Sequence, residues 1–366
     1  MIKVLHVLSD SNIGGAGTYV ANYIKNCDLT VVAPTVLVPC GSAVIKLLKN
    51  TNCDIIEADI APDKSFDINS IKVIRSYIKT GNYQIVHAHG SASARLASKG
   101  MCKSVFTKHT LSYNKSGLRG FVDKIMYRVT GGYAIAVSDA ARQNLIDLGF
   151  NKKHIFTVLN GVSDMGVADS QKQADCKKSF GIDASKYVVG CLARFSPEKD
   201  YGTFLKAAAK LSEINDKFAF LLCGDGVTLN EMKTYAKTLG IYSKCVFAGT
   251  VFDPERAYNA MDLYCITSKY ESYGQSLVEA WSAKLPSVTT DAAGFCEIST
   301  NGETSLICKK GDADAIANSI MLLFEDKQKA LDLAKCGYAR YKEKFDAKTF
   351  AKNIENVYEQ IIKIRE

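Results

Sequence analysis

The sequence lacks the features of a membrane-spanning or secreted protein. None of its apolar runs approaches the roughly 20 consecutive apolar residues that a membrane-spanning helix needs. The first ten residues, MIKVLHVLSD, run directly into a strand-like alternation and lack the basic, long apolar and small-residue regions of a signal peptide. The composition, with 47% apolar and 23% charged residues, is that of a globular protein with sizeable cores. We therefore expect a cytoplasmic protein.

The cysteines also lack any arrangement typical of a zinc site or a disulfide framework. Twelve are scattered between Cys27 and Cys336, and no two of them form a C-x-x-C pair. Cys191, Cys223 and Cys265 lie in apolar, strand-like runs, where a cysteine packs as a small hydrophobic residue. A reducing compartment fits this distribution.

Positive charge is unevenly distributed along the chain. Residues 1–160 hold 19 Lys and Arg against 10 Asp and Glu, whereas residues 161–366 hold 27 against 28. Between residues 99 and 128 the only acidic residue is Asp123, and the basic residues are Lys99, Lys103, Lys108, Lys115, Arg119, Lys124 and Arg128. Such a run is most often a solvated face. The alternative is a surface that meets anionic lipid headgroups, phosphorylated substrates or nucleic acid.

Two series of buried strands alternate with helical periods. The expected strands are residues 2–9, 29–38, 84–90, 103–110 and 131–138 in the first series and 187–195, 218–226, 244–251, 263–269 and 286–292 in the second. Apolar runs separated by helices indicate parallel sheets built from βαβ units. At 366 residues, two α/β domains are expected.

The segments that follow each domain have different characters. Residues 163–180 are polar and aperiodic, which predicts a linker or a surface excursion. At the end of the chain a long amphipathic helix is expected. Its apolar stripe consists of Phe350, Ile354, Val357, Tyr358, Ile361 and Ile362.

A glycine-rich stretch, SNIGGAGTYVANYI, follows the first strand and leads into a helical period. Gly14, Gly15 and Gly17 allow backbone to approach a ligand, and the start of a helix favours an anion. The spacing is not the G-x-G-x-x-G of dinucleotide-binding proteins. A tight structural turn is an equally good interpretation.

Histidines end two successive strands of the first domain. His89 and His109 are expected to face one crevice, because ligands gather at the carboxyl ends of parallel strands. We expect His87 to alternate to the other side and to pack in the core, and His6, in the middle of a strand, to do the same. No carboxylate lies nearby in sequence, so these histidines do not predict a metal site.

Two short stretches in the second domain carry charges suited to a ligand. Arg194 and Lys199 follow its first strand, where a planar fork of donors and a point charge suit a diphosphate. A surface loop with incidental charges is the alternative. In ESYGQSLVEA, Glu271 and Glu279 lie eight positions apart, with Gly274 between them. The two carboxylates could form an acid/base pair, bind a metal ion or contact different parts of one ligand.

Together these stretches resemble retaining glycosyltransferases of family 4. The matching motifs, in the family's order, are GGAG, HAHG, KHT, NGV, ARFSPEKD, CGDG, ESYGQSLVEA and AGFCEI. The resemblance covers essentially the whole chain, and its specific part is the E-x7-E stretch with Arg194 and Lys199 upstream. It implies the GT-B fold, in which two Rossmann-like, doubly wound parallel-sheet domains face each other across a cleft. The implied division is an acceptor domain, 1–162, a nucleotide-sugar domain, 163–344, and a returning C-terminal helix, 345–366.

The resemblance also implies how the donor is bound. Arg194 and Lys199 match residues that neutralise the diphosphate, and Gly15 matches a loop that closes on it. Glu279 matches the carboxylate that binds ribose hydroxyls, and Glu271 the one that holds hydroxyls of the transferred sugar. The backbone groups expected at sugar, phosphate or base are those of Tyr273, Gly274, Gln275, Ser276 and Val251. On this interpretation the two glutamates hold different ends of one ligand, and neither a catalytic dyad nor a metal site is expected.

On the acceptor side, His109 matches a histidine near the transferring sugar, and His89 lies close to it. In the family, transfer with retention is thought to follow a front-face path in which the departing diphosphate helps to take the acceptor proton. The catalytic set is then Glu271, His109, Arg194 and Lys199, with no metal or other cofactor.

This sequence departs from the family pattern at three positions. Ala193 and Ser272 replace common glycines, and Gln275 stands where a small or aliphatic residue is frequent. No charged role is lost, but the departures leave the identity of the donor sugar open.

The expected function is transfer from a nucleotide sugar, UDP-linked by expectation, to a glycan or lipid-linked acceptor in cell-envelope, capsular or exopolysaccharide synthesis. The main alternative is a UDP-sugar 2-epimerase of the same fold. A nicotinamide dehydrogenase is disfavoured by the missing fingerprint. A nucleic-acid module is disfavoured because no nucleic-acid motif accompanies the charge, so no nucleic-acid partner is expected. An amphipathic stretch within the basic region 99–128 is a further hypothesis for peripheral contact with an anionic membrane at the inner face of the cell membrane.

Overall fold

The chain folds into two units, each with its own parallel sheet. The computed structural model describes residues 1–49, 51–109, 125, 129–271 and 273–364. Unit 1 comprises Met1–Gly161 and Asp346–Glu366, and unit 2 comprises Val162–Phe345. These limits lie within one residue of the boundaries expected from the sequence.

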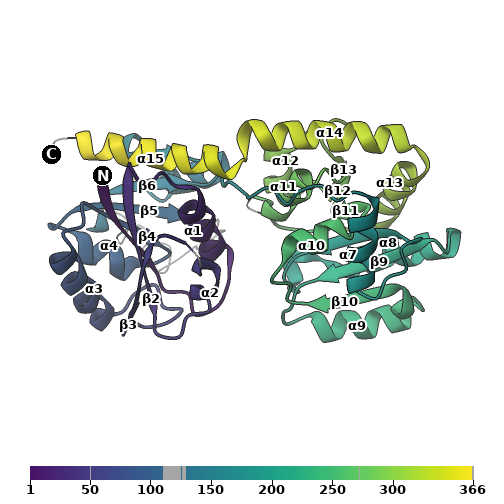
Figure 1. Ribbon diagram of the computed structural model, residues 1–366, viewed down its shortest axis with the longest axis horizontal. Helices are drawn as coiled ribbons and strands as arrows, with labels where there is room; N and C mark the ends of the chain where they lie inside the picture. Colours follow the sequence, from purple (N-terminus) through teal and green to yellow (C-terminus); the bar gives the residue numbers. More distant parts are fainter. Residues whose placement is uncertain (50, 110–124, 126–128, 272, 365–366) are drawn as a thin grey trace. The chain divides into compact units, whose positions relative to one another are not determined.

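Unit 1 alternates strands and helices, and the last helix of the chain joins it (Figure 1). Its elements are β1 (Ile2–Leu8), α1 (Gly15–Asn26), β2 (Val32–Pro39), α2 (Ile45–Leu48), β3 (Asp54–Ala58), α3 (Ile68–Gly81), β4 (Ile85–His89), α4 (Ala92–Ser98), β5 (Lys103–Lys108), β6 (Tyr133–Ala136), α6 (Asp139–Asp147), the 3-10 turn η1 (Lys152–His154), β7 (Ile155–Thr157) and α15 (Ala347–Lys363).

The sheet of unit 1 is parallel throughout and has the order β3-β2-β1-β4-β5-β6-β7. Its central strands are buried along most of their length because helices cover both faces of such a sheet. The chain proceeds from β1 outward to β3 and then returns to β4 on the other side of β1. The order therefore reverses between β1 and β4.

The C-terminal helix α15 packs on unit 1 through the predicted apolar stripe. Phe350, Ile354 and Tyr358 are almost fully buried, and α15 contacts α1. Gly161 permits a close approach to this helix, because a Cβ there would lie 2.3 Å from the Cβ of Phe350. The predicted amphipathic helix is thereby confirmed.

Unit 2 repeats the alternation. Its elements are α7 (Ser170–Ser179), β8 (Tyr187–Leu192), η2 (Pro197–Lys199), α8 (Tyr201–Ile214), β9 (Phe218–Cys223), α9 (Leu229–Thr238), η3 (Tyr242–Lys244), β10 (Cys245–Gly249), α10 (Pro254–Asn259), β11 (Leu263–Cys265), α11 (Gln275–Ser282), β12 (Ser287–Thr290), α12 (Ala293–Ile298), β13 (Leu306–Cys308), α13 (Ala313–Glu325) and α14 (Lys327–Lys344).

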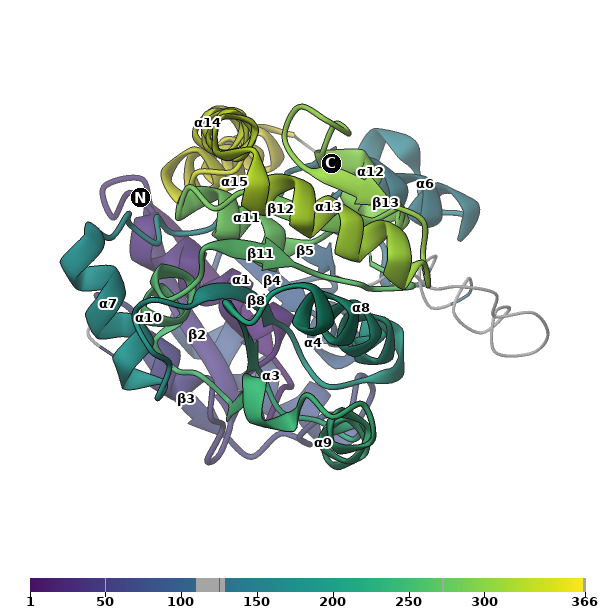
Figure 2. The same ribbon diagram turned by 90° about the vertical axis from the view of Figure 1, so that its right-hand side faces the viewer.

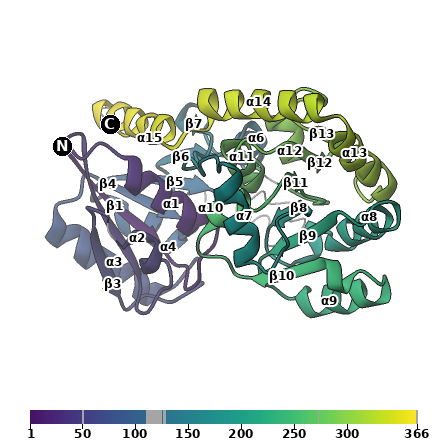
Figure 3. The same ribbon diagram turned by 45° about the vertical axis from the view of Figure 1, so that its right-hand side comes forward.

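The sheet of unit 2 is also parallel, in the order β10-β9-β8-β11-β12-β13. Helices α8 and α13 lie side by side, as Figure 2 shows, and α11 packs against α14. Figure 3 shows α8 and α9 beside the half of the sheet formed by β8, β9 and β10. The expected fold, two Rossmann-like α/β domains, is confirmed.

Three strands that the sequence did not predict are β3, β7 and β13, which all lie at sheet edges. An edge strand buries less of its surface, so its apolar pattern is weak. β3 reads DIIEA with only its last residue buried, and β7 and β13 have three residues each.

The predicted linker 163–180 was wrong over most of its length, because residues 170–179 form α7. Asp169 caps this helix by accepting a bond from Lys172 N at 2.8 Å. The helix is anchored by Lys177, whose Nζ lies 2.8 Å from Asp262 Oδ2 with only 5% of the lysine side chain exposed. A polar anchor of this kind leaves no hydrophobic period for sequence reasoning to find.

Among the helices described here, none combines the length and apolar character needed to cross a membrane.

Candidate functional site

In unit 2 the strand order reverses between β8 and β11, and the predicted residues cluster at that point. The carboxyl ends of parallel strands share one edge, and ligands of such sheets bind where the order reverses. The loops that follow the two strands are in direct contact there. Lys269 N donates to Glu198 O at 2.8 Å, and Thr267 Oγ1 donates to Asp200 O at 2.9 Å.

The ion pair between Lys199 and Glu271 joins these two loops. Lys199 Nζ lies 2.5 Å from Glu271 Oε2, and the side chains are only 18% and 13% exposed. Arg194 differs, because its side chain is 75% exposed and its Nη2 lies 3.7 Å from Glu198 Oε1. Two of the predicted charges therefore meet at the reversal point, while Arg194 extends into solvent beside a carboxylate.

A glycine sets the turn into α11. Gly274 has φ +93°, which an L side chain rarely adopts, and a Cβ there would lie 2.8 Å from the ring of Phe295. The helix begins at the next residue, Gln275, and none of the described side chains caps it. The first turn of α11 therefore presents backbone N–H groups at the same sheet edge, where the helix dipole favours an anion.

Glu279 is buried one turn inside α11. Its Oε2 accepts from Tyr258 OH at 2.8 Å, and its Oε1 accepts from Gln275 Nε2 at 2.9 Å. Burial raises the pKa of the Glu279 carboxyl, and the hydrogen bonds from Gln275 and Tyr258 act in the opposite direction. Gln275, which departs from the family pattern, thus holds this carboxylate four residues along the helix, and Tyr258 is a partner that sequence reasoning missed.

The glycines of the CGDG stretch allow it to pack closely against the loop after β8. A Cβ on Gly224 would lie 2.0 Å from Ala193 O, and one on Gly226 would lie 2.2 Å from Phe195 O. Tyr201 OH also donates to Ala193 O at 2.7 Å. This loop is therefore preorganised by its own backbone and its neighbours.

Val251 follows β10, which is the edge strand two positions from β8 in the sheet. Its predicted contact with a base stays a prediction.

In unit 1 the order reverses between β1 and β4, and the glycine-rich stretch follows β1. Gly15 is the first residue of α1, is exposed, and has open space where a Cβ would be. Gly17 is buried, and a Cβ there would lie 3.0 Å from Val44 Cγ2. Of these two glycines, Gly17 serves packing, whereas Gly15 leaves room for a ligand.

The prediction that His87 points away from His89 was wrong. Residues two apart in a strand share a face, and the rings of His87 and His89 lie 4.3 Å apart. β1 pairs with β4 so that His6 stands beside His87, which places all three histidines on one face. His6 Nδ1 lies 3.2 Å from His89 Nε2. The sequence did not predict that His6 lies beside His87 and His89, because this contact depends on the register between β1 and β4.

His87 and His109 hold different positions around this group. His87 is fully buried between Tyr358 OH, 2.6 Å from Nδ1, and Thr107 Oγ1, 2.7 Å from Nε2. His109 is partly exposed, and its Nε2 lies 3.2 Å from His89 Nδ1. The structure therefore brings His89 and His109 together, as predicted.

Burial keeps these imidazoles neutral near pH 7. It lowers the pKa of His6 to about 3 and that of His109 to about 4. The pKa values of His87 and His89 are also well below the usual range, first through burial and then through the neighbouring histidines.

Two family models match consecutive parts of the chain. The model described as Glycosyltransferase Family 4 matches residues 13–164, and the one described as Glycosyl transferases group 1 matches residues 172–340. The chain is a glycosyltransferase. In this chain a family 4 domain is followed by a group 1 domain.

Curated relatives of this glycosyltransferase are distant. EpsF of Bacillus subtilis (strain 168), a candidate glycosyltransferase, is 28% identical over 79% of this chain and 79% of its own length. The lipopolysaccharide core biosynthesis mannosyltransferase LpsB of Rhizobium meliloti (strain 1021) is 25% identical over 56% of this chain, and the match spans 61% of LpsB.

Among solved structures, that of Anabaena Alr3699/HepE in complex with UDP and glucose resembles this glycosyltransferase with a TM-score of 0.84. The match covers 98% of this chain and 100% of that chain at 20% identity, so it concerns the fold.

Most of the basic region 99–128 lies outside the described residues, which omit 110–124 and 126–128. In the part that is described, Lys108 is buried and Lys99 Nζ donates to Val129 O at 2.9 Å. Lys108 therefore does not contribute to an exposed basic face.

A cavity of about 1020 Å³ opens between α8 and α9 of unit 2, and Asp200 and Lys269 of the two contacting loops also line it. Tyr201 and Lys206 of α8 and Met232 and Tyr235 of α9 line it, and Pro197 reaches it from the loop after β8. It neighbours the reversal point, but neither Lys199 nor Glu271 is among its lining residues.

Proposed function

We propose that this glycosyltransferase moves a sugar from a UDP-sugar to a glycan or lipid-linked acceptor in cell-envelope, capsular or exopolysaccharide synthesis. The observation that carries the proposal is the partly buried Lys199–Glu271 pair at the reversal point of unit 2, beside the start of α11. A cation, a carboxylate and free helix N–H groups at one sheet edge suit a sugar diphosphate. The UDP bound in HepE and the lipopolysaccharide role of LpsB support the choice of donor and pathway.

Each group at this edge has a proposed role. Lys199 and Arg194 neutralise the diphosphate together with N–H groups of residues 273–276, and Glu271 holds hydroxyls of the transferred sugar. Glu279 accepts from ribose hydroxyls and Val251 contacts the base. Glu271 also orients Lys199. The ligand therefore replaces one contact of a lysine that is already held in place, and binding does not have to immobilise a mobile side chain.

The acceptor is assigned to the reversal point of unit 1. His89 and His109 lie at the carboxyl ends of neighbouring strands, and Gly15 begins the helix after the adjacent strand. We assign acceptor binding to the two histidines and approach to the donor diphosphate to Gly15.

Transfer is proposed to proceed with retention and without a metal ion. Charge on the departing diphosphate is stabilised by Lys199, Arg194 and the start of α11, which is the task a divalent cation performs in other transferases. Rates measured with and without EDTA test the second point, because a metal-dependent enzyme would lose activity in the chelator. The anomeric configuration of the product, read by NMR, tests retention.

The direct test of the function is incubation with a panel of UDP-sugars, with and without glycan and lipid-linked acceptors. Release of UDP that depends on an acceptor, with a glycosylated product, is the expected result. Isomerised nucleotide sugar formed without acceptor would show a UDP-sugar 2-epimerase instead. A thermal-shift screen of UDP-, GDP- and ADP-sugars identifies the donor beforehand, since a ligand that binds only the native state raises its melting temperature.

Peripheral membrane contact through residues 99–128 is part of the proposal for a lipid-linked acceptor. It is supported by the local excess of basic residues. Co-sedimentation at low salt with anionic vesicles, but not with neutral ones, is expected. Equal binding to both would remove this element of the proposal.

A further inference from the structure

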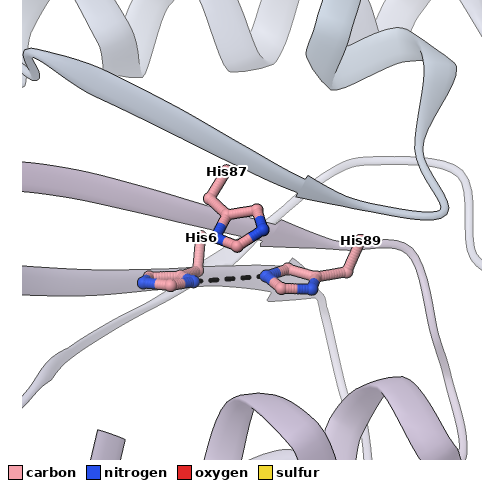
Figure 4. A group of neighbouring side chains, drawn as sticks. All are labelled: His6, His87 and His89. Atoms are coloured by element: carbon pink, nitrogen blue, oxygen red, sulfur yellow. Dashed lines mark hydrogen bonds between the residues drawn. The ribbon is translucent and has the colours of Figure 1, made fainter. Parts of the chain in front are cut away.

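Three imidazoles of unit 1 form one hydrogen-bonded chain. Figure 4 shows His6 and His89 joined by a bond, with His87 above them. His6 Nδ1 lies 3.2 Å from His89 Nε2, and His89 Nδ1 lies 3.2 Å from His109 Nε2. Each link joins two ring nitrogens, so one nitrogen of each link must donate and the other must accept.

A chain of neutral imidazoles has only two arrangements of its protons. A neutral ring carries one N–H, so the tautomer of one ring fixes the tautomers of the others. In the outward arrangement all three rings are protonated on Nδ1, and His6 donates to His89, which donates to His109. In the inward arrangement all three are protonated on Nε2, and the bonds run the other way. The arrangements differ at His109, whose Nδ1 is a donor in the first and an acceptor in the second.

The inner end of the chain favours the outward arrangement. His6 is 1% exposed, and its Nε2 has no hydrogen-bond partner among the described residues. The inward arrangement would place an N–H on this nitrogen, whereas the outward arrangement leaves a lone pair there. Among backbone groups, buried N–H donors without partners are rarer than under-satisfied carbonyl acceptors, and we take the same preference to hold for this imidazole.

We propose that His6 and His89 are positioning residues that hold His109 as the Nδ1-protonated tautomer, so that His109 meets its sugar substrate as a hydrogen-bond donor and not as a base. This deepens the proposed function, on which the contact with substrate rests. The orientation of the ring is held as well, because His109 lies edge-on to Tyr19 with ring centroids 4.8 Å apart. The low pKa values of the buried rings agree with a neutral chain.

A metal ion is the competing interpretation of this cluster. Ligand atoms of His6, His87 and His89 lie within 4.8 Å of one another. However, both nitrogens of His87 already bond hydroxyl groups, and the described group includes no carboxylate. A divalent cation there would be buried among neutral ligands and would have to displace Tyr358 or Thr107 from His87.

The tautomers are measured directly by NMR of the ¹⁵N-labelled full chain at pH 7. Long-range ¹H–¹⁵N correlations show which nitrogen of each ring is protonated, and the sequence has only five histidines to assign. We expect Nδ1–H for His6, His89 and His109. Nε2–H at His109, a charged His109, or stoichiometric zinc in the purified protein would each overturn the proposal.

Two variants test the positioning role. His6→Asn places an amide that can donate to His89 Nε2, so His109 should keep its tautomer. His89→Phe removes the partner of His109, so a mixture of tautomers is expected there. If His109 remained purely Nδ1-protonated in His89→Phe, the chain would not be what fixes it. These readouts need no substrate, so they stand even if the proposed transfer reaction is not found.

The role toward substrate is tested by paired changes at His109. His109→Asn keeps an amide nitrogen near the position of Nδ1, whereas His109→Gln places it near Nε2. If His109 is a donor, His109→Asn should lower kcat/KM by no more than about tenfold, and His109→Gln should lower it further. Loss of the same size in both variants, roughly 10²-fold or more, would indicate a base instead.

Discussion

Glu271 and Glu279 differ most in what their carboxylates already contact. Glu271 pairs with a cation near the sheet edge, whereas Glu279 is buried and accepts from Tyr258 and Gln275. Glu279→Ala would remove the acceptor of Gln275 Nε2 and one of the two acceptors of Tyr258 OH, which also donates to Ser276 O at 3.1 Å, and would therefore confuse stability with binding. The amide variants separate the roles better, because they keep side-chain shape.

Glu279→Gln is expected to weaken UDP binding by at least about tenfold, since hydrogen bonds to a charged acceptor are the strong ones. Glu271→Gln should leave UDP affinity within about threefold and lower the rate of sugar transfer. Calorimetric titration with UDP and initial rates with the UDP-sugar measure both. Equal loss of UDP affinity in the two variants would contradict this division of roles.

Gly274→Ala tests the turn into α11. Strain at φ +93° and the contact with Phe295 are expected to cost about 1–3 kcal/mol. Gly202→Ala is the matched control, because a Cβ there meets only Asp200 Oδ1 at 3.7 Å and lies in α8. Urea unfolding should show a large loss for the first variant and none for the second. Similar stability in both would show that the turn carries no strain.

At the scale of elements, α15 is tied to the sheet of unit 1 by a polar contact as well as by its apolar stripe. Tyr358→Phe removes the hydroxyl 2.6 Å from His87 Nδ1 and leaves that buried nitrogen without its partner. A loss of about 1–3 kcal/mol in the free energy of unfolding is expected. Tyr338→Phe on α14 is the control, since its ring contacts Lys284 and Lys342 without requiring the hydroxyl. Equal urea midpoints for the two variants would argue against the tie.

How well the sequence predicts an element depends on how that element is buried. Central strands and the stripe of α15 bury apolar side chains at regular spacing, so their periods are visible. The edge strands β3, β7 and β13 and the polar helix α7 lack this signal. Within the candidate site, Lys199, Glu271 and His89 could be predicted because they lie at or after the carboxyl ends of predicted strands. The position of His6 beside His87 follows from strand register, and the contact of Tyr258 with Glu279 follows from tertiary packing. Neither can be predicted from the local sequence.

At the scale of the whole molecule, both units follow one plan. Each parallel sheet reverses its order beside its first strand, and the candidate residues lie at the carboxyl edge there. The plan explains why motifs after β1, β4, β8 and β11 carry the resemblance to glycosyltransferases.

The buried histidines predict a loss of stability in acid. Their folded pKa values are lowered, so below the unfolded value of about 6.5 the unfolded chain takes up protons that the folded chain does not. Their contribution is complete above that pH and is lost as the pH falls toward the folded values. The raised pKa of Glu279 acts in the opposite direction.

His6→Phe isolates one of these contributions. When the pH falls from 7.5 to 5.5, the free energy of unfolding of the variant should decrease by about 1.4 kcal/mol less than that of the unchanged protein. Urea titrations at both pH values measure this difference. Identical pH dependence in the variant and the unchanged protein would mean that His6 is not kept neutral by the fold.

The central claim is that the donor site is the reversal point of unit 2, and hydrogen–deuterium exchange with saturating UDP tests it most directly. Bound UDP should slow exchange in residues 193–200 and 268–279, with smaller effects in 230–238, which line the cavity between α8 and α9. Protection confined to 230–238, or to unit 1, would contradict the account.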